Sequence, residues 1–183
     1  MLKQSVILLA VWGSCGLSTL AADFPPPYEA VYEQDNAGQK ITTKVASDGK
    51  GKVKSTGEMS TGKVETAIDY SAKTTTTVMH AQHMWIKQPI KEGFMDETAL
   101  KKVAKSLGAK TFNGHPCHGY ETTSAGSVSQ TWIGDDLHLM VHSETTIGKV
   151  KTTSDLKSYS SKPGDVALAI PVDCKEFKMP DAQ

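Results

Sequence analysis

The sequence of 183 residues contains no arginine, and its 20 basic residues, all lysines, are balanced by 20 acidic residues. A protein that binds nucleic acid through its phosphates needs a surplus of positive charge, so this balance excludes a strongly basic nucleic-acid binder. The missing guanidinium group also removes the usual bidentate clamp for phosphate and carboxylate groups. The length allows one ordinary domain.

Motifs that carry catalysis are also missing. There is no glycine-rich phosphate loop, no dinucleotide-binding fingerprint and no G-x-S-x-G nucleophile elbow. No pattern pairs a nucleophile with a base, and the acidic pair Asp135–Asp136 is typical of a tight turn. The sequence therefore predicts a protein that is not an enzyme and needs no cofactor.

The chain has one long hydrophobic run, at its N-terminus. Residues 5–17 are mostly apolar and follow Lys3, and small residues precede a favourable cleavage position after Ala21 or Ala22. The run is shorter than the about 20 residues that a membrane-spanning helix needs. We expect residues 1–22 to be a signal peptide and residues 23–183 to form a single periplasmic or secreted domain without a transmembrane segment. An uncleaved anchor and lipoprotein processing at Cys15 are the alternatives.

Two cysteines, Cys117 and Cys174, remain after the expected cleavage. An even number of cysteines in an exported protein predicts a disulfide, here one that closes a loop of about 57 residues. The alternative is a reactive thiol at Cys117, which His115 and His118 flank.

Most of the remaining sequence alternates over short runs that end at turn residues. The run from Val64 to Tyr70 is an example, and about nine or ten such runs predict an antiparallel sheet. Residues 74–86 form a β-prone stretch that is long for one strand. One helix is predicted over residues 96–107, capped by Asp96 and ended by Gly108, and lying against the sheet. Its apolar stripe consists of Leu100, Val103, Ala104 and Leu107.

The six histidines come in three close pairs, which raises the alternative of a copper or zinc site. Candidate ligands are His80, His83, His138, Met140 and His142. The last three would share one face of a strand. Against a site, His80 and His83 would point to opposite faces of a regular strand, so we predict no metal site.

Two stretches, residues 107–120 and 130–137, resemble a recurring bacterial pattern of a helix followed by strands around a Gly-x-x-Cys-x-x-Tyr motif. The residues Lys157-Ser158-Tyr159 and 169–172 match its closing segment. The chain thus resembles, over roughly residues 28–180, a family of exported bacterial domains of unknown function that is similar in fold to the lipoprotein carriers LolA and LolB. The resemblance implies a mostly β (α+β) fold, a large curved antiparallel half-barrel with one principal helix packed on its concave face.

In the carriers the concave face holds acyl chains, so the resemblance implies a hydrophobic or lipid-like ligand. The candidate lining residues are Ile68, Tyr70, Leu100, Leu107, Trp132, Leu137, Leu139 and Val141. The sequence therefore predicts an exported, non-enzymatic protein that binds such a ligand. The alternatives are a periplasmic metal binder, and a structural or protein-interaction module with a partner in the cell envelope.

Overall fold

The computed structural model describes residues 24, 26–90, 97–124, 126–162 and 164–178, so the predicted signal peptide, Cys15 and the predicted helix cap Asp96 lie outside the described residues. The first half of the chain forms β1 (Tyr28–Asn36), β2 (Gln39–Ser47), β3 (Lys52–Met59), β4 (Gly62–Asp69), β5 (Thr74–Met79), the 3-10 turn η1 (His80–Gln82) and β6 (Met84–Pro89). The second half forms α1 (Glu97–Val103), β7 (Lys105–Phe112), β8 (His115–Ser124), β9 (Ser127–Gly134), β10 (Met140–Ile147), β11 (Val150–Ser160) and β12 (Lys175–Glu176).

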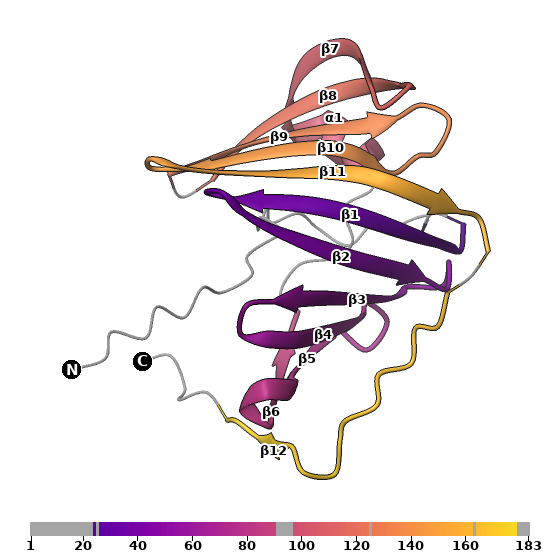
Figure 1. The fold of residues 1–183 in the computed structure, drawn as a ribbon. Coiled ribbons are helices and arrows are strands. Elements are labelled where there is room, and N and C mark those ends of the chain that lie inside the picture. The colour runs from indigo at the N-terminus through magenta and orange to yellow at the C-terminus, as the bar shows by residue number, and fades with distance from the viewer. Residues whose placement is uncertain (1–23, 25, 91–96, 125, 163, 179–183) are drawn as a thin grey trace.

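All these strands belong to one curved sheet, which is open and not closed into a barrel (Figure 1). Their order is β12-β6-β5-β4-β3-β2-β1-β11-β10-β9-β8-β7, so two runs of hairpins meet where β1 pairs with β11. Only the short β12 runs parallel to its neighbour, β6, among the described strands. The predicted fold class, an open antiparallel half-barrel with one principal helix, is confirmed.

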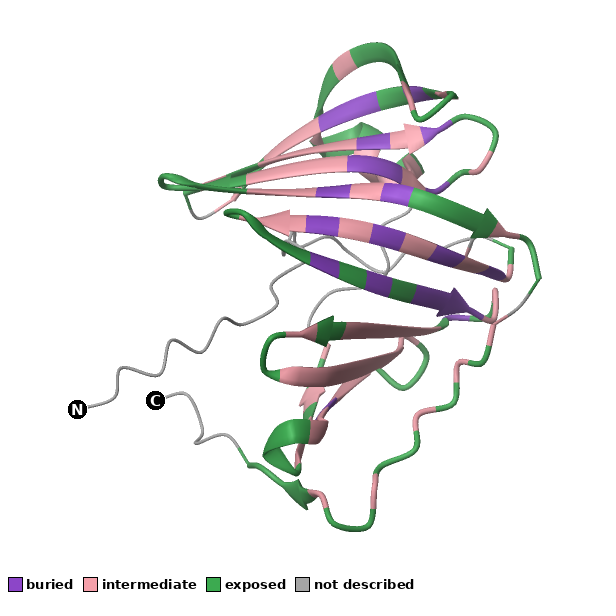
Figure 2. Cartoon of the chain, in the orientation of Figure 1, coloured by how far each residue is buried: buried purple, intermediate pink, exposed green. Residues whose placement is uncertain are grey.

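The alternation of buried and accessible side chains along β1 distinguishes the two faces of the first half of the sheet. Tyr28, Ala30 and Tyr32 are buried on one face, while Glu29 and Glu33 lie on the other. The register of β1–β6 is regular, so residues that pair across these strands lie on the same face of the sheet. Figure 2 shows the buried residues alternating along β1 and β2. We call the face of Tyr28, Ala30 and Tyr32 the tyrosine face, and the face of Glu29 and Glu33 the charged face.

The core lies where the two halves meet. Tyr32 pairs with Leu156 of β11, and its hydroxyl donates to the carbonyl oxygen of Met140 at 3.0 Å. Burial raises the pKa of Tyr32, which keeps the hydroxyl a neutral donor. The same core cluster contains Tyr28, Ala30, Val45, Cys117, Trp132, Leu139 and Val141. The core cluster of the described residues therefore spans the seam between β1 and β11.

The predicted helix is shorter than the sequence pattern indicates. α1 ends at Val103, and Leu107 lies in β7, which pairs with β8. Gly108 does not end a helix but follows an irregularity in β7 with a positive φ of 80°. The helix lies against β8 (Figure 1). The Tyr120 hydroxyl of β8 donates to the Glu97 carboxylate at 2.8 Å. None of its residues is buried, so it covers the sheet without filling a core.

The β-prone stretch over residues 74–86 is divided between two strands. β5 ends at Met79, η1 follows, and His83 takes a left-handed conformation with φ 50° before β6 begins. The stretch that is long for one strand thus forms the two strands of a hairpin, whose tight turn no glycine or proline marks.

The segment after β11 runs back to the first half of the sheet (Figure 1). We call residues 164–177 the C-terminal strap. The Lys54 ammonium group donates to the Ala167 carbonyl oxygen at 2.7 Å and pairs with Asp165 at 3.2 Å, which fixes the strap on the charged face. Its end becomes β12 at the edge of β6. Within the described residues, no helix is long and apolar enough to cross a membrane.

Candidate functional site

The structure separates the predicted ligand-binding residues into two groups. Trp132, Leu139 and Val141 are buried in the core, so a ligand reaches them only by displacing that core. The others are half-buried: Leu107 and Leu137 pack on the core cluster, Leu100 lies on α1, and Ile68 and Tyr70 lie at β4. Four strands, β3, β2, β1 and β11, separate β4 from β10 in the sheet. The predicted residues therefore do not form one surface.

Ile68 belongs to an apolar surface on the tyrosine face. It pairs across the strands with Val53 of β3 and Thr75 of β5. These side chains are only partly buried, in contrast to the same face over β1 and β2. We call Val53, Met59, Val64, Ile68 and Ile86, which share this face of β3–β6, the apolar surface.

A small hollow of about 20 Å³ opens at the β2 side of the apolar surface. Its lining consists of Ile41, Thr43, Ser55, Gly57, Met59, Val64 and Thr66. The missing side chain of Gly57 leaves room above Thr43, whose buried hydroxyl has no hydrogen-bond partner among the described residues. Since burying an unpaired hydroxyl costs free energy, the hollow suits one water-sized polar group.

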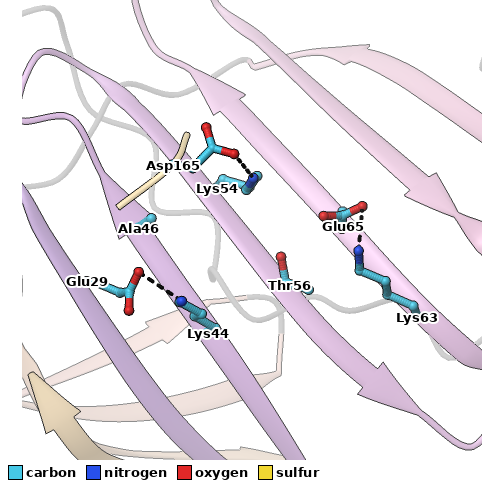
Figure 3. A pocket seen from close by; sticks show the side chains of 8 residues that line it. All are labelled: Glu29, Lys44, Ala46, Lys54, Thr56, Lys63, Glu65 and Asp165. Atoms are coloured by element: carbon cyan, nitrogen blue, oxygen red, sulfur yellow. Dashed lines mark hydrogen bonds and ion pairs between the residues drawn. The ribbon is translucent and has the colours of Figure 1, made fainter. Parts of the chain in front are cut away.

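A larger groove of about 270 Å³ lies on the charged face (Figure 3). It is lined by Glu29, Lys44, Ala46, Lys54, Thr56, Lys63, Glu65 and Asp165. Its three lysines each pair with a carboxylate: Lys44 with Glu29 at 2.9 Å, Lys54 with Asp165 at 3.2 Å and Lys63 with Glu65 at 3.2 Å. Opposite charges therefore neutralise one another in the groove, and the ion pairs join β1 to β2 and β3 to the strap, while Lys63 and Glu65 both lie on β4.

Histidine–carboxylate pairs recur across the sheet. The His80 ring nitrogen lies 2.7 Å from Glu65, and His142 lies 2.7 Å from Asp155. Three further pairs, His83–Asp173, His115–Asp136 and His118–Asp135, span 2.6 to 2.9 Å. Each pair joins two segments of the chain, and the first of these three attaches the strap to the turn before β6.

The acid partner of His80 has a perturbed pKa. Burial alone raises the pKa of Glu65, but hydrogen bonds from His80 and Lys63 outweigh it and lower that pKa below its ordinary value of 4.5. A carboxylate whose pKa is lower in the folded state stabilises that state above its ordinary pKa. This contribution is lost as the pH falls through the lowered folded value.

We therefore expect Glu65→Gln to lower the free energy of unfolding by about 1 kcal/mol at pH 6. The difference from the parent protein should shrink below pH 4, where the parent carboxylate also becomes protonated. Urea unfolding at the two pH values measures this. Glu58→Gln, at an exposed position on β3, is the control, and a deficit for Glu65→Gln that is independent of pH would contradict the expectation.

The candidate metal ligands do not converge. His80 and His83 lie in and after η1, and His138 takes a left-handed conformation, φ 53°, in the turn before β10. Among the described residues no group of three or more histidine, cysteine, aspartate or glutamate side chains is placed to hold a metal ion.

The predicted disulfide is absent, because Cys117 and Cys174 are both free thiols. Cys117 lies in β8, next to the last strand at one end of the sheet, while Cys174 directly precedes β12 at the other end. The Cys117 thiol donates to the His115 carbonyl oxygen at 3.2 Å, and burial raises its pKa, so it is poorly suited to nucleophilic chemistry.

Sequence reasoning missed both the hollow and the charged groove. Lys44, Lys54, Lys63 and Glu65 were a usable signal for the groove, since these charged residues fall on one face of the sheet. The hollow had no such signal, because it depends on the strand register that places Gly57 opposite Thr43.

Comparison with known proteins supports the fold. No family model matches the chain, and no curated protein matches it in sequence. Among solved structures, an uncharacterized conserved protein from Thermus thermophilus has 10% identity and a TM-score of 0.64, covering 85% of this chain and 91% of that one. A chain of the Pseudomonas aeruginosa MucA/MucB complex has 14% identity and a TM-score of 0.54, and a structure of MucB has 14% and 0.51.

The match covers 86% of this chain in the MucA/MucB complex and 84% in the MucB structure, but only 60% of the matched chain in both. At these identities the likeness shows the fold alone. These neighbours have the LolA-like fold, so the resemblance that the sequence motifs indicated is confirmed at that level.

Proposed function

We propose that this chain is a non-enzymatic binding protein that holds a lipid-like ligand on the apolar surface of β3–β6. The observation that supports this most is the contrast along the tyrosine face. Over β1 and β2 the face is buried, whereas over β3 and β4 the side chains of Val53, Val64 and Ile68 stay partly accessible. Accessible apolar side chains gathered on one face are typical of a ligand surface.

The hollow beside this surface suits the polar end of such a ligand. The unpaired hydroxyl of Thr43 can donate to a carbonyl or carboxyl oxygen, and Gly57 leaves the space for it. Val64 and Ile68 are four residues apart on β4, so together they offer about 13 Å of strand for an apolar chain. A ligand with one polar end and one apolar chain matches both parts.

The proposal includes the absence of catalysis and a place in the cell envelope. The lysines and carboxylates of the charged groove neutralise one another, and its lining contains no serine, cysteine or histidine. The leader-like N-terminal run supports export to the periplasm, where a carrier would meet lipids.

We expect Ile68→Glu to weaken the binding of a fluorescent fatty acid at least tenfold, because the new carboxylate would lie in the apolar surface. The matched control is Ala67→Glu, one residue away on the charged face, where Ala67 pairs with Lys54. Fluorescence titration measures both variants. If Ile68→Glu does not fold, Ile68→Thr replaces it. Equal binding by the parent and both variants, or no binding by the folded parent, would disprove the lipid proposal.

A second candidate function is protein binding. It is favoured by the likeness to MucB, which was solved in complex with MucA, and by β7, whose outer edge has no neighbouring strand among the described residues. An open edge can accept a partner strand. Native mass spectrometry of protein from its own host separates the two: a retained lipid supports the first function, and a retained polypeptide the second.

A further inference from the structure

The tip of the β10–β11 hairpin is unusually apolar for an exposed turn. Ile147 and Val150 pair with each other across the hairpin and are 56% and 49% exposed. Val128 of β9, 39% exposed, pairs with Thr146 on the adjacent rung. We call Val128, Ile147 and Val150 the apolar tip.

The tip extends past the strand that supports β11. The last paired residue of β1, Asn36, lies opposite Thr152, and the rungs of Lys151 and Val150 continue beyond it. Figure 1 shows this hairpin projecting at the left of the sheet, and Figure 2 shows its end exposed. Because side chains alternate, Ile147 and Val150 face one side and Val128 the other, so the tip is apolar on both faces.

The charge around the tip has one sign. Residues 122–129 and 145–153 contain two lysines, Lys149 and Lys151, and no aspartate or glutamate. Lys151 also pairs with Glu144 at 2.7 Å, farther from the turn. Serine and threonine make up most of the remainder of these two runs. The apolar tip is therefore flanked by uncharged hydroxyl groups and has a positive charge at its turn.

We infer that this tip inserts into the surface of an anionic lipid bilayer. A specific protein interface buries about 800 Å² on each partner, far more than three side chains supply. A flat protein surface would cover only one face of the tip, whereas a bilayer surrounds an inserted tip and removes both apolar faces from water. Lysine at the turn matches anionic headgroups, and hydroxyl groups suit the hydrated interface. The contact would be weak and reversible, and it does not depend on the proposed lipid-binding function.

Vesicle sedimentation tests the inference. The protein is used in the form that its host accumulates, with the same N-terminus in every variant. Vesicles of phosphatidylcholine with about a third phosphatidylglycerol should bind the parent protein better than pure phosphatidylcholine. Ile147→Ser/Val150→Ser should lower the partition coefficient about tenfold or more. Lys149→Gln should lower it about fivefold at low salt, and this difference should vanish in high salt.

The matched control is Val103→Ser, because Val103 is 44% exposed on α1, away from the tip. It should leave the partition coefficient unchanged. If the double serine variant melts lower than the parent, Ile147→Thr/Val150→Thr retains β-branched residues and replaces it. The inference is overturned if the parent does not bind anionic vesicles, if the tip variants bind as well as the parent, or if Val103→Ser loses as much. It is also overturned if sedimentation velocity shows a dimer that only the tip variants dissolve, since the tip is then an interface between copies.

Discussion

Gly119→Val is expected to lower the free energy of unfolding by about 3 kcal/mol or more, although valine favours strands. Gly119 of β8 pairs with Trp132 of β9, and the indole ring lies across the glycine. A Cβ atom at this position would come within 2.6 Å of the ring. The ring would have to leave a site where it also contacts Phe112, at 5.1 Å between ring centroids. The packing of Trp132 therefore requires the glycine.

Urea unfolding followed by tryptophan fluorescence measures this effect. The control is Gly57→Ala in the middle of β3, where the added Cβ would lie at an ordinary 3.5 Å from the Thr43 hydroxyl. Alanine there should be neutral or stabilising by up to about 1 kcal/mol. If Gly119→Val were as stable as the parent, or if Gly57→Ala were equally damaging, the Trp132 contact would not be the cause.

Leu156→Ala should have a similarly large effect, a loss of about 2 to 5 kcal/mol. Leu156 is buried at the seam, opposite Tyr32, and its carbonyl oxygen accepts a hydrogen bond from the Asn113 side chain at 2.9 Å. The β7–β8 turn thus closes over this part of β11, and little room remains for the core to collapse around a shortened side chain.

Val150→Ala on the same strand is the control, because Val150 is half exposed and its truncation leaves no cavity. Its loss should stay within about 0.5 kcal/mol. Equal losses for the two variants in denaturant unfolding would mean that the seam does not dominate stability.

The predictions from sequence succeeded where local alternation and burial agree. The alternating run from Val64 predicts that Val64, Thr66 and Ile68 share one face of a strand. β4 has this arrangement, because successive side chains of a strand point to opposite faces. The antiparallel sheet and its principal helix also followed from short turns and scarce helical periodicity, whereas the open half-barrel was implied by the resemblance to the carrier-like family.

Other predictions failed because they depend on contacts between distant residues. Leu107 fits a helical stripe, but the pairing of β7 with β8 decides its conformation. The disulfide was predicted from an even count, which carries no information about distance, and the sheet order separates the two thiols. Part of the predicted ligand face is buried in the core. Alternation indicates which apolar side chains share a face, but it does not indicate which of them another segment covers.

The pairing of β1 with β11 also affects when the protein can finish folding. Glu29 lies opposite Ser160, so β1 cannot pair with β11 until a segment more than a hundred residues later has been synthesised. Contacts of such sequence separation slow folding, and until they form the edge of β1 is open to pairing with other chains. The C-terminal strap is made later still, yet it binds Lys54 of β3 and the edge of β6. The N-terminal half of the sheet is thus completed by a segment that is made after β11, and a chain truncated before this segment would be left with an unpaired edge at β6.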